Sequence, residues 1–580
     1  MSKIEPVIGS PAGVRRKSSR ARWAPRCLMG VAVLSAVAMV GATLNGRPAI
    51  NRPQTSNQIG KTNSESFNAT LATIDLQLAA MAQQAGVETA STADNLTVAR
   101  RLSLALVGSG LSLEELRALE LQPNEQQIPW LTNYLLNDPR WNDYFAQRFS
   151  RALVGTDNGP FLLFRRRKLN AWLAEQLRND VGYDHIVRDM MSSEGLWTDT
   201  PQVNFVTATM DEANEGRGDP IRLAGRTGRA LLAQRIDCLQ CHDDFVDNSN
   251  FGTSDQPIGG TQQHFHELAA FYSGTALAST VFSGITDDGT AYRYKYLGDS
   301  DETEVKPAVP FSPELLPIEG KPRARLAAWV THRDNHAFAR ATVNRVWGLM
   351  LSRPLVEPVD SIPLDGSIPQ VLDTLSDDFA ANGFQLRRLI RLIAASSAFT
   401  RDSRSDFEVT EQHEHAWSVF PLTQLRPDQV VSSLLQASKL ATLDDSSSIF
   451  TRLIAFGESL DFLQRFGDRG DNEFDSDAVT ITQRLVMMNG ELVAERTSVD
   501  LVNNACTRIA SLVSDDRQAV ELIFLTILNR HPSPDEQTEF GDYLASQAQD
   551  PTNKVTRSRE QALSDIAWAM LNSTEFSWNH

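Results

Sequence analysis

The sequence predicts a mainly α-helical protein in which two helical domains, joined by a β-hairpin and a proline-rich connection, follow an N-terminal signal or membrane segment. A chain of 580 residues is too long for one ordinary domain. Its apolar fraction of 41% suits globular domains with hydrophobic cores. Apolar residues recur at helical spacing over much of the chain, as in the face formed by Ala339, Val343, Val346, Trp347 and Met350.

Residues 1–27 form a basic N-terminus, and residues 28–44 are apolar and carry no charge. This arrangement is typical of a secretory signal or of a single membrane anchor, with the basic end in the cytoplasm and the body outside. We therefore expect an exported protein of the periplasm or cell envelope. Residues 28–44 hold it in the membrane as a single-pass anchor, or it is secreted if this segment is cleaved. The marked charge asymmetry disfavours the alternative, a buried helix of a soluble protein.

The charge outside the N-terminus is strongly acidic. Residues 1–47 carry eight basic side chains and one acidic one, a charge of +7, so the rest of the chain carries −24 of the total of −17. Because phosphate binding needs a basic face, this balance argues against nucleic acid as a partner. The four cysteines, at positions 27, 238, 241 and 506, are too few for a disulfide scaffold.

The first helical domain follows a polar linker. Residues 45–68 are rich in Asn, Gln, Ser and Thr and show no apolar periodicity, which predicts the linker. Residues 69–280 then show helical periodicity. Ser112 and Glu115 have the spacing of a capping box, which predicts a helix that begins after Ser112.

The stretch Cys238-Leu239-Gln240-Cys241-His242 is the place where spacing alone implies chemistry. We expect it between a helix over 221–236 and a shorter helix over 262–272. Two thiols three positions apart can add to the vinyl groups of haem as thioethers, and the adjacent histidine can bind the iron. The motif therefore predicts haem c attached through Cys238 and Cys241, with His242 as the proximal iron ligand.

Other interpretations of these residues stay open. Cys238 and Cys241 could form a local redox disulfide or be plain buried thiols. Together with two of His242, His264 and His266, they could instead bind zinc tetrahedrally.

The second axial ligand of a haem at this motif is not obvious from the sequence. Small cytochromes use a downstream methionine, but no methionine lies between Met210 and Met350. His266 or His264 is then the candidate distal ligand, or the sixth iron position is open.

Residues 281–320 change character and predict a β-hairpin followed by a linker. The turn-forming residues 286–289 separate an apolar run from the alternating tyrosines of 292–296, and prolines gather over 307–322. Residues 321–580 are helical again and form the predicted C-terminal domain. Pro427 and Pro534 stand at the first position of two expected helices.

Several stretches resemble a large family of secreted, Planctomycete-type proteins that pair two domains of unknown function. In the first domain, which is called cytochrome-C-like because of its Cys-x-x-Cys-His motif, the matching stretches are 99–104, 238–243 and 268–272. In the second they are 325–329, 338–347 with its Asn-Arg-Val-Trp motif, 389–393, 528–532 and 569–576. The resemblance implies an exported, mainly helical protein and supplies no reaction. Asp244 departs from the family, which commonly has a histidine at this position.

Two hypotheses follow for the function. The first is a c-type-cytochrome-like redox or electron-transfer protein with one covalent haem and a redox partner protein. The second is a non-haem exported protein, binding or hydrolytic, whose Cys/His/Asp loop holds a metal or a disulfide. No catalytic residue can be assigned from residue order alone, and no Gly-rich phosphate loop is present.

Overall fold

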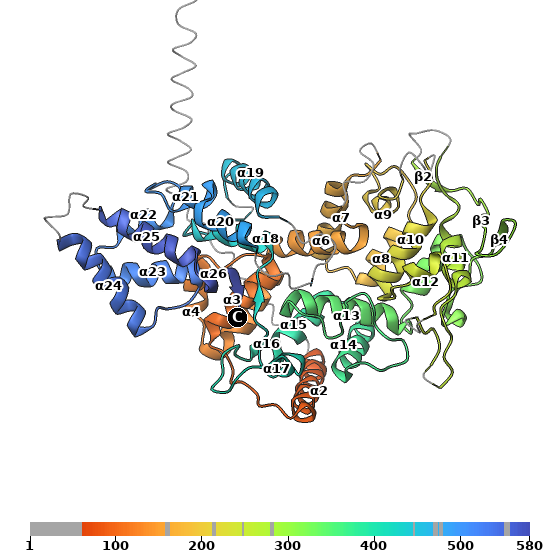
Figure 1. Ribbon diagram of the computed structural model, residues 1–580, viewed down its shortest axis with the longest axis horizontal. Helices are drawn as coiled ribbons and strands as arrows, with labels where there is room; N and C mark the ends of the chain where they lie inside the picture. The colour runs from red at the N-terminus through yellow and green to blue at the C-terminus, as the bar shows by residue number, and fades with distance from the viewer. Residues whose placement is uncertain are drawn as a thin grey trace, which may run out of the picture. The chain divides into compact units, whose positions relative to one another are not determined.

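The computed structural model describes residues 61–156, 163–210, 216–245, 249–253, 255–278, 284–444, 447–467, 474, 480–549 and 557–580. As predicted, helices dominate these residues, and the strands are short (Figure 1). The predicted basic N-terminus and the apolar segment 28–44 lie outside the described residues. Within the described part of the chain, we find no helix that is both long and apolar enough to cross a membrane.

The helices that precede the predicted connection are α2 Lys61–Ala85, α3 Asn95–Val107, α4 Leu113–Glu120, α5 Gln127–Leu136, α6 Pro139–Val154, α7 Arg166–Arg178, α8 Tyr183–Ser192, α9 Asn204–Thr207, α10 Pro220–Arg226 and α11 Gln262–Ala269. Those that follow it are α12 Pro322–Val330, α13 His336–Leu351, α14 Gln370–Ala381, α15 Leu386–Ala395, α16 Ser397–Thr400, α17 Glu411–His415, α18 Pro427–Ala437, α19 Ile449–Phe466, α20 Ile481–Asn489, α21 Glu491–Arg496, α22 Ala505–Leu512, α23 Asp516–Leu528, α24 Pro534–Gln549, α25 Arg559–Leu571 and α26 Thr574–Ser577.

The helix starts predicted from the sequence are confirmed. The backbone N–H of Glu115 donates to the Ser112 hydroxyl at 3.0 Å, and the Ser112 N–H donates to the Glu115 carboxylate at 2.9 Å. This reciprocal capping box satisfies two N–H groups that a helix start leaves without partners. Helices α18 and α24 begin at Pro427 and Pro534. Helix α2 already begins at Lys61, so the helical region starts earlier than the predicted linker allows.

The predicted hairpin region pairs differently from the expectation. Strand β1 (Thr275–Leu277) pairs with β2 (Ile285–Asp287), and β3 (Tyr292–Tyr294) pairs with β4 (Thr303–Val305), both antiparallel. The turn at 286–289 therefore separates two small sheets and does not close one hairpin. A third pair joins β5 (Thr423–Gln424) to β6 (Trp578–Asn579). The alternation of residues predicted strands here, but it carried no information about which strand pairs with which.

The helix expected over 221–236 is shorter than predicted. Helix α10 ends at Arg226, a π-helical turn covers Thr227–Leu231, and Ala233 has a left-handed φ of 49°. The Gln234 side chain donates to the Ile362 carbonyl at 2.7 Å, and the Ile362 N–H donates to the Ala233 carbonyl at 2.9 Å. These contacts to a distant segment satisfy backbone groups that further helix would have used.

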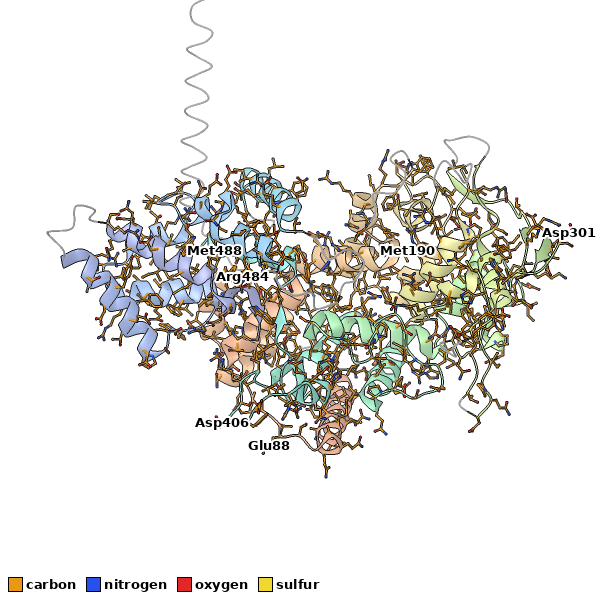
Figure 2. The ribbon with its side chains drawn as sticks, in the orientation of Figure 1. Glu88, Met190, Asp301, Asp406, Arg484 and Met488 are labelled. Atoms are coloured by element: carbon orange, nitrogen blue, oxygen red, sulfur yellow. The ribbon has the colours of Figure 1, made fainter. Side chains whose placement is uncertain are left out.

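Two hydrophobic clusters hold the helices together. The first holds residues between Ile74 and Phe420 together with Leu525. It takes in helices on both sides of the predicted connection, because α8 packs on α12, α3 on α13 and α2 on α14. Met190 on α8 is fully buried in this cluster, whereas Asp301, between β3 and β4, lies at the outside (Figure 2). The second cluster is built mainly from residues 425–576. The first core is thus continuous across residues 281–320.

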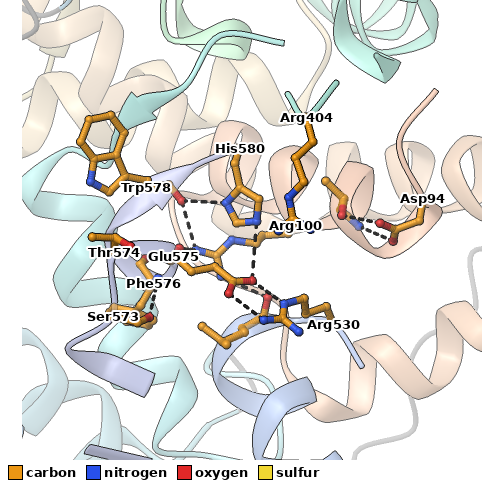
Figure 3. Close-up of polar contacts among 12 residues, drawn as sticks. Asp94, Arg100, Arg404, Arg530, Ser573, Thr574, Glu575, Phe576, Trp578 and His580 are labelled. Carbon is orange, nitrogen blue, oxygen red and sulfur yellow. Dashed lines mark hydrogen bonds and ion pairs between the residues drawn. The ribbon is translucent and has the colours of Figure 1, made fainter. Parts of the chain in front are cut away.

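The C-terminal residues are bound to α3 by a buried arginine (Figure 3). The Arg100 guanidinium donates to the carbonyls of Leu528 at 3.2 Å and Phe576 at 3.0 Å. Arg530 pairs with the carboxylates of Glu575 and Glu536, each at 2.7 Å. Because charged hydrogen bonds are stronger than neutral ones, these contacts fix the end of the chain against its first helices.

Candidate functional site

The Cys-x-x-Cys-His motif forms a single surface turn. Asp237–Gln240 is a 3₁₀-helix, and the Cys241 N–H donates to the Cys238 carbonyl at 3.2 Å. Residues three apart are eclipsed in this type of helix, so the turn carries both cysteines on one face. Both are exposed free thiols, whereas Cys506 on α22 is buried. The thiols predicted to react are therefore the accessible ones.

The opposite face of the turn is anchored in the core by Leu239, which is fully buried. Gly260 packs against it closely enough that an added Cβ would lie 2.8 Å from Leu239 Cδ1 and 2.8 Å from Ser249 Cβ. Only glycine fits at position 260 without displacing the anchor. The turn is thus held from behind while its thiols face solvent.

His242 follows on the same exposed turn, and its ring is oriented by its neighbour. Its Nδ1 lies 2.6 Å from the Asp243 carbonyl oxygen. A carbonyl can only accept, so this contact assigns the proton to Nδ1 and leaves Nε2 as the basic nitrogen. Metal-binding histidines are commonly oriented in this way. The Phe245 ring stacks on the imidazole with a centroid distance of 5.7 Å, which adds an apolar surface beside it.

The carbonyl of Gln240 ties the motif turn to the neighbouring elements. It accepts hydrogen bonds from His266 Nε2, from the Tyr294 hydroxyl and from the Gln262 side-chain amide, each at 3.1 Å. Gln262 and His266 belong to α11, and Tyr294 belongs to β3. Asp243 adds a further link, because its carboxylate accepts from the Gln262 N–H at 2.7 Å.

His266 supports the turn through both of its ring nitrogens. It is fully buried, its Nδ1 lies 2.9 Å from the Tyr292 hydroxyl, and its ring stacks on Tyr294 with a centroid distance of 3.4 Å. Burial lowers the pKa of His266, although the hydrogen bond to Gln240 acts in the opposite direction. A neutral ring that donates from Nε2 and accepts at Nδ1 satisfies both contacts. The structure therefore places this candidate distal ligand as a support behind the motif.

His264 caps the helix that carries it. Its Nδ1 accepts from the Thr261 N–H at 3.2 Å and lies 3.0 Å from the Thr261 hydroxyl. Its ring meets Phe251 edge to face at 5.2 Å. Burial lowers its pKa, and the carboxylates of Glu267 and Asp243 oppose this shift. His264 thus helps to start α11 beside the motif.

The cluster of ligands expected for zinc is not gathered in the described residues: no three His, Cys, Asp or Glu side chains lie close enough together there to hold a metal ion. Tyr292 and Tyr294, the partners of His266 and of the Gln240 carbonyl, were not among the residues predicted to matter at this site. The alternation of the tyrosines along the chain indicates that they share one face of a strand, and this pattern could have marked them as candidate contact residues. It does not reveal which residues of other elements they contact.

Comparison with known families follows the same division of the chain. Residues 73–274, which include the motif, match the family PSCyt2, described as a protein of unknown function (DUF1549). Residues 322–453 match the family PSD1, described as a protein of unknown function (DUF1553). No curated protein and no solved structure matches the chain.

Proposed function

We propose that this chain, which carries a PSCyt2 domain followed by a PSD1 domain, is an exported c-type-cytochrome-like redox protein. One haem c is attached covalently at Cys238 and Cys241, and His242 is the proximal iron ligand. A haem bound in this way supplies a one-electron couple.

The observation that carries the proposal is the orientation of His242. The Asp243 carbonyl accepts a hydrogen bond from the Nδ1–H of His242 at 2.6 Å, so Nε2 is the nitrogen available for iron. The two accessible thiols stand on the same turn, one residue and four residues before this histidine. The residues present therefore fit the group that the motif implies.

The chain's own residues have distinct roles in this proposal. Cys238 and Cys241 hold the group, and Leu239 holds the turn. His266 keeps the Gln240 carbonyl in place through Nε2, and its Nδ1 contacts the Tyr292 hydroxyl, so both ring nitrogens have protein partners. His266 is therefore a weaker candidate for the distal iron ligand than His264. A sixth iron position without a protein ligand is also favoured over His266.

Export and the partner are part of the same proposal. The basic N-terminus and the apolar segment 28–44 support export, with a membrane anchor if the segment is not cleaved. Thioether attachment of haem outside the cytoplasm is consistent with this location. A charge of −24 outside residues 1–47 favours a redox partner protein with a basic docking face.

The absorption spectrum of the full chain tests the proposal. The chain is expressed with its export segment in a host that has haem-attachment machinery, and we expect a Soret band together with haem that stays on the polypeptide under denaturing conditions. The variant Cys238→Ser/Cys241→Ser loses this haem. The matched control, Cys506→Ser, alters a buried cysteine far from the motif in sequence and should keep the haem.

A colourless wild-type protein with both cysteines intact would contradict the haem proposal. Zinc and free thiols measured on that same sample then test the alternative, a non-haem binding or hydrolytic protein whose Cys/His/Asp loop holds a metal or a disulfide. A zinc:protein ratio near one, lost with the two cysteines, identifies that alternative.

A further inference from the structure

Tyr292 and His266 form a hydrogen-bonded pair directly behind the motif turn. The Tyr292 hydroxyl lies 2.9 Å from His266 Nδ1, and His266 Nε2 lies 3.1 Å from the Gln240 carbonyl oxygen. A carbonyl can only accept, so Nε2 carries the ring proton and Nδ1 accepts from the phenol. The fold therefore places a basic nitrogen against a phenol proton, at the distance that proton transfer requires.

Burial keeps both partners of this pair uncharged. His266 is fully buried and Tyr292 is half-buried. Burial lowers the pKa of His266, so its ring is neutral near pH 7 and its Nδ1 can act as a base. Burial also raises the pKa of the Tyr292 phenol, so the phenol keeps its proton as long as the ring is not oxidised. Loss of an electron makes a phenol a far stronger acid, and the imidazole is then in place to take the proton.

The pair is connected to the motif turn by a short path. The ring of His266 stacks on that of Tyr294 with a centroid distance of 3.4 Å, and it lies 5.9 Å from that of Tyr292. Closely packed aromatic rings give an electron short steps between neighbours. The Gln240 carbonyl, which accepts from His266, belongs to the peptide bond that leads into Cys241. The path from this cysteine to Tyr292 thus runs through one peptide unit and two hydrogen bonds.

The other phenols have partners that take up a proton less readily. Tyr294 donates to a backbone carbonyl, which is not a base near neutral pH. Tyr543 donates to the Asp565 carboxylate at 2.9 Å, but a carboxylate is ordinarily a weaker base than an imidazole. All eight tyrosines of the sequence lie in the described residues, and Tyr292 is the one whose hydroxyl is hydrogen-bonded to a histidine there.

From these contacts we infer that Tyr292 is a redox-active tyrosine and that His266 is its proton acceptor. A strong one-electron oxidant derived from peroxide takes one electron from the phenol. The O–H bond breaks, the proton moves to Nδ1, and a neutral phenoxyl radical remains beside an imidazolium that still donates to Gln240. A one-electron reductant of the ascorbate class reverses the step, because it returns the electron while Nδ1 returns the proton.

The pair therefore removes oxidising equivalents from the neighbourhood of the two exposed thiols. It uses a phenol and an imidazole alone, so it does not depend on a haem at the motif.

Flash oxidation of the full chain, followed by electron paramagnetic resonance, tests the inference. The oxidant is tris(bipyridine)ruthenium(III), generated by light. We expect a tyrosyl radical signal in wild type and its loss in Tyr292→Phe, which removes only a hydroxyl. Tyr543→Phe is the matched control, since it removes a phenol that donates to a carboxylate, and it should keep the signal. The absence of a tyrosyl signal in wild type, or equal signals in wild type and Tyr292→Phe, would overturn the inference.

The variant His266→Gln examines the proton acceptor. A glutamine amide can donate and accept hydrogen bonds but cannot take up a proton near neutral pH, so the radical signal should be lost. A measurement on wild type covers the case in which this variant fails to fold. Histidine with isotopically labelled nitrogen should add a nitrogen coupling to the radical, because the imidazolium donates to the phenoxyl oxygen. A radical without this coupling would contradict the assignment.

The same flash experiment on Cys238→Ser/Cys241→Ser separates this inference from the haem proposal. The variant has no thiols at the motif to hold a haem, yet the signal should persist because Tyr292 and His266 are unchanged. Loss of the signal with the cysteines would show that the pair does not act on its own, and the inference would be wrong. A colourless wild-type chain that yields the signal would refute the haem proposal and support this one.

Discussion

At the scale of single residues, His580 links the stability of the C-terminal cluster to pH. Burial and the nearby Arg100 guanidinium lower the pKa of His580 to about 4, although the Glu575 carboxylate at 3.8 Å acts in the opposite direction (Figure 3). In the unfolded chain this histidine regains its ordinary pKa of about 6.5. As the pH falls from 6.5 towards 4, the unfolded chain therefore takes up a proton that the folded chain does not.

The free energy of unfolding should consequently fall as the pH is lowered through this window, by an amount on the order of 1–3 kcal/mol from His580. Urea unfolding at pH 7 and pH 5 measures the change. The variant His580→Gln should show a smaller loss between the two pH values than wild type. Equal losses in both proteins would show that His580 does not titrate in this way.

The histidines near the motif illustrate what residue order can and cannot predict. The sequence places His242, His264 and His266 near the two cysteines along the chain. It could not show that both ring nitrogens of His266 contact Gln240 and Tyr292, because Tyr292 lies 26 residues away on β3. Side-chain partners of this kind depend on how helix and strand meet.

At the scale of elements, the motif turn depends on the glycine that packs behind it. An alanine at position 260 would bring its Cβ to 2.8 Å from Leu239 Cδ1, which is closer than packed carbon atoms lie. We expect Gly260→Ala to reduce the free energy of unfolding by about 1–3 kcal/mol, the usual cost of overpacking a core. It should also lower the fraction of chains that carry haem.

The neighbouring Gly259→Ala is the matched control, because its Cβ would meet nothing within 4 Å. Thermal unfolding and haem content of the two variants are measured together. If both behave as wild type, the turn does not rely on close packing at Gly260.

Element starts were easier to predict than element partners. Capping residues and prolines act on their own helix, so Ser112, Pro427 and Pro534 marked true helix starts. The end of α10 and the pairing of β2 with β1 depend on contacts with other segments, such as Ile362 with Ala233. Local sequence carries no record of those contacts, and both features were mispredicted.

At the scale of the whole molecule, the first hydrophobic core unites the segments before and after residues 281–320. Tyr183 of α8 stacks on Phe338 of α13 with a centroid distance of 5.8 Å, and α8 packs on α12. We therefore expect a fragment of residues 61–320 to lack a cooperative unfolding transition, because it exposes apolar surface that α12 and α13 cover.

Thermal unfolding of this fragment, compared with residues 61–580, checks the expectation. Loss of near-ultraviolet circular dichroism with helical signal retained would indicate that the core needs both parts. A sharp transition of the fragment alone would instead show that residues 61–320 fold independently.

The central claim, a haem held by Cys238 and Cys241, is tested most directly by intact-mass spectrometry of the exported chain. We predict that the denatured polypeptide carries the added mass of one haem, and that a proteolytic digest places this mass on the peptide that contains both cysteines. An unmodified mass for a chain produced alongside an active haem-attachment system would contradict the account.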